Sequence, residues 1–337
     1  MANIKRRASV RIRPHEAGLK LLDFLTDRFT YKNRNQWQKS IVAGSLRVNR
    51  KATISDRILE CDDTVEYRPP EQPEPSIDQD FTILYEDEDL LAINKSGNLP
   101  CHPSGRYFTR TLWYLLKNTK NLDYMGMINR LDRETSGIVL IAKNKEAARC
   151  CRQQFERRTV QKHYSVLVEG PFPKEPIHAR GMLELSAESE IRKKYKFSPI
   201  PSDEENTAAG KFCETIFKNQ DRFKEISLIS AVLITGRTHQ IRATLNSLGY
   251  PVVGDKLYGV DETIYLRFIS DQLTDKDSRR LRIPRQALHA AMLRLEHPTR
   301  NTPMTFEAPM PSDMLKLMEN DRSNATSSAS QVDKQWR

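Results

Sequence analysis

The sequence NRLDRETSGIVLIAKN, at residues 129–144, joins a charged loop to an apolar run. The apolar part, from Ile138 to Ala142, has the length of one buried β-strand. The charged part carries Arg130 and Asp132 on either side of a leucine. This pattern predicts a carboxylate and a guanidinium on a loop that a core strand holds in place, as catalytic side chains often are. A turn cap and a solvated charge would also account for these two residues taken alone.

Length and hydropathy limit the class of protein. The 337 residues favour two domains, one of them large, and the 38% of hydrophobic residues are enough for a core. No apolar run reaches the length that crosses a bilayer, and the N-terminus lacks the apolar segment of a signal peptide. We therefore expect no membrane partner and a cytoplasmic location, and we expect the chain to act as a monomer.

Charge and cysteine usage favour a nucleic-acid partner. The net charge is +10 and the isoelectric point is about 9.3, which suits a polyanionic partner. The five cysteines are odd in number and none occurs in a C-x-x-C spacing, which argues against a disulfide framework and against a thiolate zinc site. The glycine-rich fingerprints of nucleotide-binding loops do not occur in the sequence. We expect neither a cofactor nor a metal.

Composition divides the chain into five segments. A basic arm comes first, followed by a small module, a proline-rich linker, a large strand-rich domain and a polar, serine-rich tail that is expected to be disordered. Their bounds are residues 1–16, 17–68, 69–80, 81–319 and 320–337. The linker has almost nothing apolar to bury, so it separates the module from the large domain.

The module combines helical and strand-like patterns. Apolar residues recur at helical spacing over residues 21–29 and again over residues 35–42, and Gly44 then ends the second helix. Short strand patterns follow at residues 46–48 and 64–67. Several basic residues decorate this unit, which fits a surface that faces nucleic acid.

The large domain consists mainly of strand patterns. Apolar runs predict strands at residues 83–85, 90–93, 161–170, 212–217 and 225–234, and helical periodicity occurs at residues 111–116 and 145–158. Residues 182–210 are the least regular part. Their basic and aromatic cluster, at residues 192–196, is consistent with a grip on RNA or with a solvated hairpin, and residues 199–209 are typical of a flexible excursion.

Two further strings accompany the NRLDRETSG loop. Residues 161–170 are QKHYSVLVEG and alternate like a half-buried strand, with Tyr164 on one face. Residues 233–242 are LITGRTHQIR, and GYPVVGDKLYG follows at residues 249–259. On the pattern alone, Tyr164 is also consistent with a core aromatic residue. His239 suggests a general base, but we favour a residue that holds its loop by hydrogen bonds.

These strings together resemble the motifs of the RluA-type pseudouridine synthases. RLDRETSG matches the family pattern RLD-x-x-TSG, the string around Tyr164 matches K-x-Y-x-x-V-x-G, and the last two strings match the G-R-T-H-Q-I-R region. Residues 17–68 resemble a small RNA-binding module shared by a ribosomal small-subunit protein and several RNA-modifying enzymes. The chain departs from the family at Asn129, which replaces the usual histidine, and at Ser96, which replaces the proline of K-P-x-G.

The resemblance implies a fold and an activity. The fold is of the α+β class, with a long, mostly antiparallel, bent sheet in the catalytic core and a small N-terminal α/β RNA-binding module. The activity is the isomerisation of specific uridines to pseudouridine in structured RNA. This reaction breaks a carbon–nitrogen bond and forms a carbon–carbon bond without any oxidation, so it agrees with the expectation of no cofactor.

The resemblance also assigns the site residues. Asp132 is the essential catalytic residue, which attacks the sugar or the base or abstracts a sugar proton; carboxylates are suited to glycosyl chemistry. Arg237 pairs with Asp132, Tyr164 lies against the target base, and Arg130 fills the space that the flipped base leaves. RNA contacts in the module are expected from its basic residues, Arg34, Lys39, Arg47 and Arg50.

Several alternatives stay open. The N-terminal module favours large-subunit ribosomal RNA as the substrate, and transfer RNA is the alternative. A catalytically silent RNA-binding or ribosome-assembly factor could share the fold, although Asp132, Tyr164 and Arg237 together count against it. A Ser/His/Asp hydrolase is disfavoured, because the sequence has no G-x-S-x-G elbow.

Overall fold

The computed structural model describes residues 7–29, 32–68, 73–120, 122–191, 193–200 and 210–332, with side chains up to residue 322. The chain forms two compact units, Met1–Pro75 and Ser76–Arg337, so the boundary falls within the proline-rich segment. Some sequence-based expectations lie outside the described residues: residues 1–6 of the basic arm, residues 69–72 of the linker, Arg192, residues 201–209 of the excursion, and residues 333–337 of the tail.

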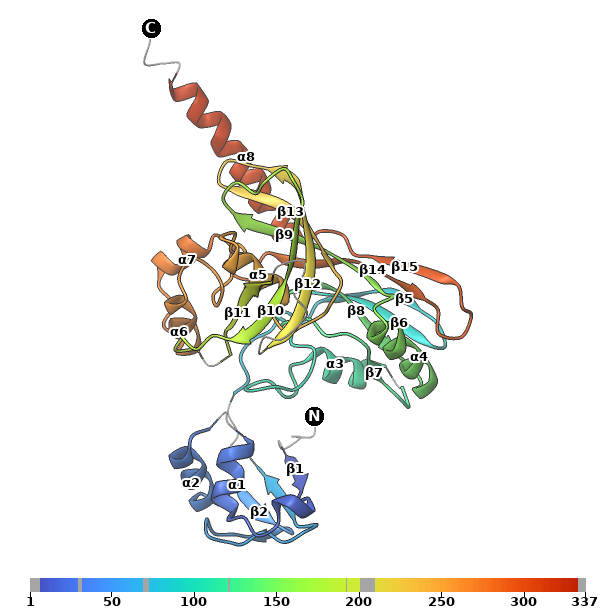
Figure 1. Cartoon of the computed structure of the whole chain (residues 1–337), viewed down its shortest axis with the longest axis vertical. Coiled ribbons are helices and arrows are strands. Elements are labelled where there is room, and N and C mark those ends of the chain that lie inside the picture. The colour runs from blue at the N-terminus through green and yellow to red at the C-terminus, as the bar shows by residue number, and fades with distance from the viewer. Residues whose placement is uncertain are drawn as a thin grey trace. The chain divides into compact units, whose positions relative to one another are not determined.

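The first unit is a small α/β module (Figure 1). Its helices are η1 (Pro14–Glu16), α1 (Leu21–Arg28) and α2 (Arg34–Val42), and its strands are β1 (Ala8–Arg11), β2 (Leu46–Val48), β3 (Lys51–Ala52) and β4 (Thr64–Tyr67). The strands form one antiparallel sheet in the order β1-β4-β2-β3. The two helices and the strands β2 and β4 that the sequence predicts are confirmed.

Helix α2 is fixed at both ends and by its buried tryptophan. The Asn33 side chain accepts the Gln36 N–H and the Gln36 side chain accepts the Asn33 N–H, which makes a capping box at its start. Gly44, with φ of +70°, follows its last turn. Trp37 is buried, donates its indole N–H to the Phe29 oxygen at 3.1 Å and anchors the core of the module.

The N-terminal segment belongs to the module. Residues 8–11 form strand β1, which pairs antiparallel with β4 and places Val10 opposite Val65. Ile12, directly after the strand, is buried in the core of the module. The prediction of an arm over residues 1–16 is therefore wrong for the described part of that segment. The segment is mostly basic, but Val10 and Ile12 alternate with polar residues, and the strand pairs with β4, more than 50 residues further along the chain.

The second unit is built on one eleven-stranded sheet. Its strands are β5 (Phe81–Glu86), β6 (Leu90–Lys95), β7 (Gly126–Met127), β8 (Ser136–Ala142), β9 (Gln161–Glu169), β10 (Ile177–Leu185), β11 (Tyr195–Pro199), β12 (Lys211–Arg222), β13 (Ile226–Leu233), β14 (Leu288–Glu296) and β15 (Pro303–Glu307). The main path is β11-β10-β12-β13-β9-β14-β8-β6-β5, with β15 beside β14 and β7 beside β8.

The pairing and the course of this sheet confirm the predicted α+β fold. Its described strands pair antiparallel except β14 and β8, which run parallel. In Figure 1, β12 and β13 run in a different direction from β5 and β6, so the sheet bends between its two halves. The strands that apolar runs predicted in this unit are all present.

Strand β8 carries the apolar half of the NRLDRETSGIVLIAKN sequence and is buried along its whole length. Ile138 and Leu140 pack into one apolar core, whereas Val139 and Ile141 pack into another. Because both faces of the strand are covered, the sequence shows a continuous apolar run instead of an alternation.

The glycine that precedes this run is required by the neighbouring strand. Gly137 lies opposite Ala290 in the parallel pairing of β8 with β14, and its φ is +109°. A Cβ at this position would lie 2.3 Å from the Ala290 oxygen. Glycine therefore lets β14 approach the end of the Asp132 loop closely.

The helices of the second unit are α3 (Leu112–Thr119), α4 (Lys145–Glu156), α5 (Gln240–Ser247), α6 (Thr263–Ile269), α7 (Asp275–Leu281) and α8 (Ser312–Val332). The sequence predicted α3 and α4 but not α6 and α7. The prediction of a disordered tail from residue 320 is wrong as far as residue 332, because α8 continues through it. Asp321 anchors this part by accepting the Glu225 N–H at 2.9 Å.

Candidate active site

Asn129 fixes the start of the Asp132 loop to strand β8. Its side-chain amide donates to the Ile138 oxygen at 3.0 Å, and its side-chain oxygen accepts the Leu140 N–H at 2.7 Å. The Asn129 side chain thus hydrogen-bonds to backbone groups of β8 to which a neighbouring strand would otherwise bond. A residue with one donor and one acceptor suits this place.

The turn after β6 holds the backbone on both sides of Asp132. The buried Cys101 thiol lies 3.4 Å from both the N–H and the oxygen of Leu131. The oxygen of Arg133 accepts the Leu99 N–H at 3.0 Å and the Lys95 ammonium at 3.2 Å. Burial lowers the pKa of Lys95 to about 8. The loop is therefore fixed at Leu131 and Arg133, and the Asp132 side chain projects between them.

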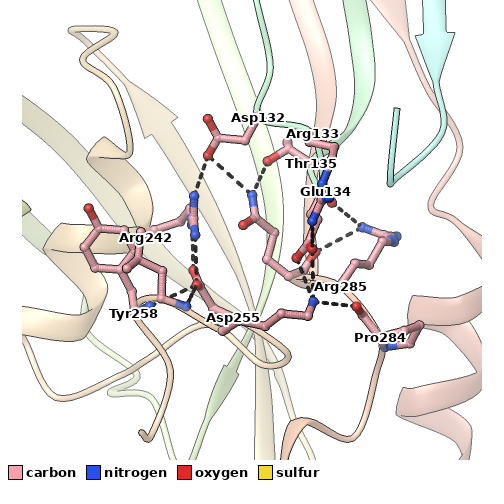
Figure 2. A network of polar contacts seen from close by, with 12 residues as sticks. Asp132, Arg133, Glu134, Thr135, Arg242, Asp255, Tyr258, Pro284 and Arg285 are labelled. Atoms are coloured by element: carbon pink, nitrogen blue, oxygen red, sulfur yellow. Dashed lines mark hydrogen bonds and ion pairs between the residues drawn. The ribbon is translucent and has the colours of Figure 1, made fainter. Parts of the chain in front are cut away.

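The Asp132 carboxylate belongs to a network of polar contacts (Figure 2). Its Oδ2 accepts a hydrogen bond from Arg242 Nη1 at 2.7 Å and a longer one from Gln286 Nε2 at 3.5 Å. The His239 Nε2 lies 3.9 Å from the other oxygen, Oδ1. The Asp132 side chain is 31% exposed, whereas that of Arg242 is 9% exposed. The carboxylate is thus held from inside the protein and open on one side.

Electrostatics keep Asp132 ionised. Burial acts to raise its pKa, but the Arg242 charge and the hydrogen bonds from Arg242 and Gln286 outweigh that effect and hold the pKa below its usual value. A carboxylate of this kind is available at neutral pH as a nucleophile or as a base.

Arg242 is itself fixed by a second carboxylate. Its Nε and Nη2 donate to the two oxygens of Asp255 at 2.6 and 2.9 Å, a bidentate pair. Asp255 Oδ1 also accepts the N–H groups of Leu257 and Tyr258, both at 2.9 Å. The Tyr258 ring lies against the guanidinium, 5.0 Å from its carbon. The remaining nitrogen, Nη1, is thereby aimed at Asp132.

The partner of Asp132 is therefore Arg242, and the prediction of Arg237 is wrong. Arg237 is exposed, precedes helix α5, and donates its Nε–H to the Phe212 oxygen at 3.1 Å. Arg242 lies inside α5, three residues after His239, and residues with this spacing share one face of a helix. Both arginines belong to the GRTHQIR string, so the motif was located correctly but the wrong guanidinium was chosen.

His239 caps the start of α5 in a left-handed conformation, with φ of +58°. Its Nδ1 hydrogen-bonds with the Tyr258 hydroxyl at 3.0 Å. Burial first, and then the Arg242 charge, lower its pKa, so the ring is neutral at pH 7. These contacts agree with the expectation of a histidine that holds its loop by hydrogen bonds.

Tyr164 lies where the two halves of the sheet meet. On β9 it is opposite Ala231 of β13 and Ala290 of β14, and its half-buried ring packs against the apolar cores on both sides. Burial, and then the nearby Asp132 charge, raise the pKa of its hydroxyl, which therefore stays protonated. A flat, rigidly held aromatic face near the carboxylate can stack on a base.

The structure places the other predicted residues at the surface. Arg130 is exposed at the Asp132 loop. Arg34, Lys39, Arg47 and Arg50 belong to the other unit, where all but the half-buried Arg47 are exposed. Arg34 pairs with Asp23 at 2.6 Å, and Asn49 and Arg50, both with positive φ, form the two-residue turn between β2 and β3.

Sequence reasoning missed Arg242, Asp255, Tyr258 and Gln286 as parts of the site. For the first three a signal was available, because they lie in the GRTHQIR and GDKLYG strings that were singled out. Gln286 had no such signal. It reaches the site from the residues before β14, where its side chain donates to Thr135 Oγ1 at 2.5 Å.

The described residues contain neither a cluster of metal ligands nor a helix that could span a membrane. No group of three or more His, Cys, Asp or Glu side chains in that part of the chain could hold a metal ion. Over the same residues, no helix has the length and apolar character needed to cross a membrane.

Comparisons with known sequences find one family. The sequence model described as RNA pseudouridylate synthase matches residues 89–247. An uncharacterized RNA pseudouridine synthase of Chlorobaculum parvum is 34% identical over 319 residues, which cover 91% of this chain and 95% of that protein. The ribosomal large subunit pseudouridine synthase D of Nitrosomonas europaea is 33% identical over 252 residues, covering 74% of this chain and 67% of that protein.

A solved structure has a similar fold. The human RNA Pseudouridylate Synthase Domain Containing 1 superimposes with a TM-score of 0.54 at 24% sequence identity. The match covers 70% of this chain and 86% of that chain. At this level of identity the likeness shows a shared fold.

Proposed function

Because the chain belongs to the RluA-type family of RNA pseudouridine synthases, we propose that it isomerises a uridine of large-subunit ribosomal RNA, with Asp132 as the catalytic carboxylate. The observation that carries this assignment is the ionised carboxylate, open on one side and held by Arg242 and Gln286. Such a group needs no further activation to act on a sugar.

The reaction is a rearrangement within one nucleotide. The bond between C1′ of the ribose and N1 of uracil breaks, the detached base turns, and C1′ bonds to C5. The hydrogen at C5 leaves as a proton and N1 takes up a proton, so nothing is oxidised. Asp132 serves as the nucleophile or base in this sequence, and Arg242 keeps it ionised and oriented.

The uridine must leave its stack before Asp132 can reach it, which costs a few kcal/mol. Stacking on Tyr164 returns roughly 1–3 kcal/mol. Arg130, which is exposed on the same loop as Asp132, is the residue we assign to the space that the base leaves. Its planar, weakly hydrated head suits a position between bases.

Two observations favour ribosomal over transfer RNA. The relative from Nitrosomonas europaea is named for the large ribosomal subunit. The N-terminal module carries Lys39 and Arg50 at its surface, which suits a second contact with a large folded RNA. A modified uridine in transfer RNA would overturn this choice of substrate but not the reaction.

The experiment maps pseudouridines in ribosomal and transfer RNA from cells with and without this gene, and then tests the purified protein on the RNA so identified. Asp132→Asn should abolish product formation while RNA binding persists, since the amide keeps the size of the side chain but is neither a nucleophile nor a base. Product formed by this variant at near the wild-type rate would rule out Asp132 as the catalytic group.

A further inference from the structure

The described residues of the turn between β10 and β11, residues 186–191, 193 and 194, include several that hold one another by hydrogen bonds. The Ser186 N–H donates to the Lys194 oxygen at 2.8 Å, and the Lys194 N–H donates to the Ile191 oxygen at 2.9 Å. The Ile191 side chain is buried in the apolar core beside α5. Residues 192–196 were expected to grip RNA or to form a solvated hairpin, and the contacts of the described residues show a turn that is held at its base.

The same turn is tied to helix α6 and to the aromatic residues beside Asp132. Lys194 Nζ donates to Glu262 Oε2 at 2.6 Å, and Ser189 Oγ donates to the same oxygen at 3.1 Å. The Tyr195 N–H donates to the Tyr258 hydroxyl at 2.9 Å. The Tyr258 hydroxyl also hydrogen-bonds with the ring of His239, which lies beside Asp132. Tyr258 therefore links the end of the turn to the site.

Among the described residues of this turn, Lys193 is the exposed lysine. It is exposed, whereas Lys194 on its C-terminal side is turned inward onto Glu262, with 17% of its side chain exposed. Within the described residues no carboxylate pairs with Lys193. Besides burial and the Arg242 charge, the charge of Lys193 contributes to lowering the pKa of His239, which places that ammonium within electrostatic reach of the site.

We propose that Lys193 binds the RNA backbone phosphate beside the target uridine and that Glu262 is the positioning residue that holds the turn for it. The inference rests on the proposed function, because it takes RNA as the substrate. A lysine ammonium is a strong phosphate ligand, and phosphate contacts fix the position of a nucleic acid without selecting its sequence. A turn that is held by hydrogen bonds before binding loses less entropy when it binds.

The test compares two lysines of the same hairpin. Lys193→Ala should weaken binding of a large-subunit ribosomal RNA transcript roughly five-fold at about 0.15 M salt and make the salt slope less negative by about 0.7–0.9. The loss should appear in Kd and KM more than in the rate at saturating RNA. Lys196→Ala is the control. It removes an equal charge, but from a lysine that is paired with Glu188 at 3.4 Å, so it should change the Kd and the salt slope far less. Equal changes in the two variants would overturn the proposal.

The Glu262→Gln variant distinguishes a positioning role of Glu262 from the effect of its negative charge on RNA binding. Removing a carboxylate makes this region more positive, so a purely electrostatic effect would tighten RNA binding. Positioning predicts the opposite, because Lys194 and Ser189 lose their ionised partner and the turn that presents Lys193 loosens. Weaker binding supports the proposal, whereas tighter or unchanged binding contradicts it.

Binding can be measured whether or not the wild type turns over. A wild type that forms no pseudouridine would contradict the proposed function while leaving the binding comparison intact. A wild type that is active, together with a Lys193→Ala variant of unchanged Kd and salt slope, would refute this inference alone.

Discussion

The arginine behind Asp132 and the surface of the N-terminal module use positive charge in opposite ways. The pair behind Asp132 is buried: Arg242 is 9% exposed and Asp255 is fully buried. In the module, Lys39 and Arg50 lie on the surface. A buried guanidinium is costly unless each of its hydrogen bonds is made, so it can hold a partner in only one geometry. An exposed one contributes long-range attraction that salt screens. The buried arginine positions the reactive carboxylate, and the exposed basic residues attract a polyanion such as RNA.

The sharpest test of this difference lies within one motif, where Arg242 is buried and Arg237 is exposed. Arg242→Met should cost about 3–5 kcal/mol of unfolding free energy, because Asp255 stays buried without its partner. The same variant should lose activity. Arg237→Met should change stability by no more than about 0.5 kcal/mol. Urea unfolding of both variants provides the measurement, and similar costs would contradict the assignment of the buried arginine.

A second test uses pH, because the catalytic unit also buries histidines. His289 hydrogen-bonds with Ser136 Oγ at 3.0 Å and with the Ala308 oxygen at 3.1 Å, and burial lowers its pKa to about 4. Its pKa in the unfolded chain is about 6.5. Its contribution to stability is therefore complete above pH 6.5 and is lost as the pH falls toward 4.

The size of that loss is about 3 kcal/mol. Chemical unfolding of the wild type and of His289→Gln between pH 7 and 4 isolates it, since glutamine does not titrate. Carboxylates with lowered pKa values contribute mainly below this range, so they affect both proteins alike. Parallel stability curves for the two proteins would show that His289 does not carry the effect.

Asn129 tests whether the loop needs a proton carrier or only a fixed backbone. Asn129→Ala removes the bonds to Ile138 and Leu140 and should cost about 1–2 kcal/mol. Asn129→His restores the side chain usual in the family and should leave the single-turnover rate within a few-fold. The rate is measured against pH. A large gain with a new ionisation near neutral pH would show that the family histidine is catalytic and that this enzyme is impaired.

The smallest effect is expected at the surface of the module. Arg50, with φ of +67°, lies in the turn between β2 and β3, so Arg50→Gly removes the charge at a position that glycine favours. The unfolding midpoint should stay constant, while RNA affinity falls a few-fold and the salt slope becomes less negative by about 0.7–0.9. An unchanged slope would remove Arg50 from the RNA contacts.

The fold was predictable where burial imposes a simple pattern. The run of residues 138–142 predicts a strand because both of its faces are covered, and the helices of the module follow from their apolar spacing. Strand β1 was missed because only Val10 and Ile12 face the core, within a basic segment. Helix α8 was missed because it depends on tertiary contacts such as that of Asp321, which local sequence does not encode.

The site was predictable to the level of the motif. The strings located the Asp132 loop, Tyr164 and the GRTHQIR segment. Sequence could not tell Arg237 from Arg242, because that choice depends on where helix α5 begins and on which side it faces. It also could not supply Gln286, since the parallel pairing of β14 with β8 is a contact between segments about 150 residues apart.

The two carboxylates that share Arg242 determine how the buried arginine stays paired during turnover. With both carboxylates ionised and His239 neutral, the group of three charged side chains carries one net negative charge. When Asp132 bonds to the substrate or takes up a proton, its negative charge passes to the substrate, and the pair of Arg242 with Asp255 is neutral by itself. No cation is left without a counterion at any step. Because Asp255 always supplies a counterion to Arg242, Asp132 can lose its charge without leaving a buried cation unpaired.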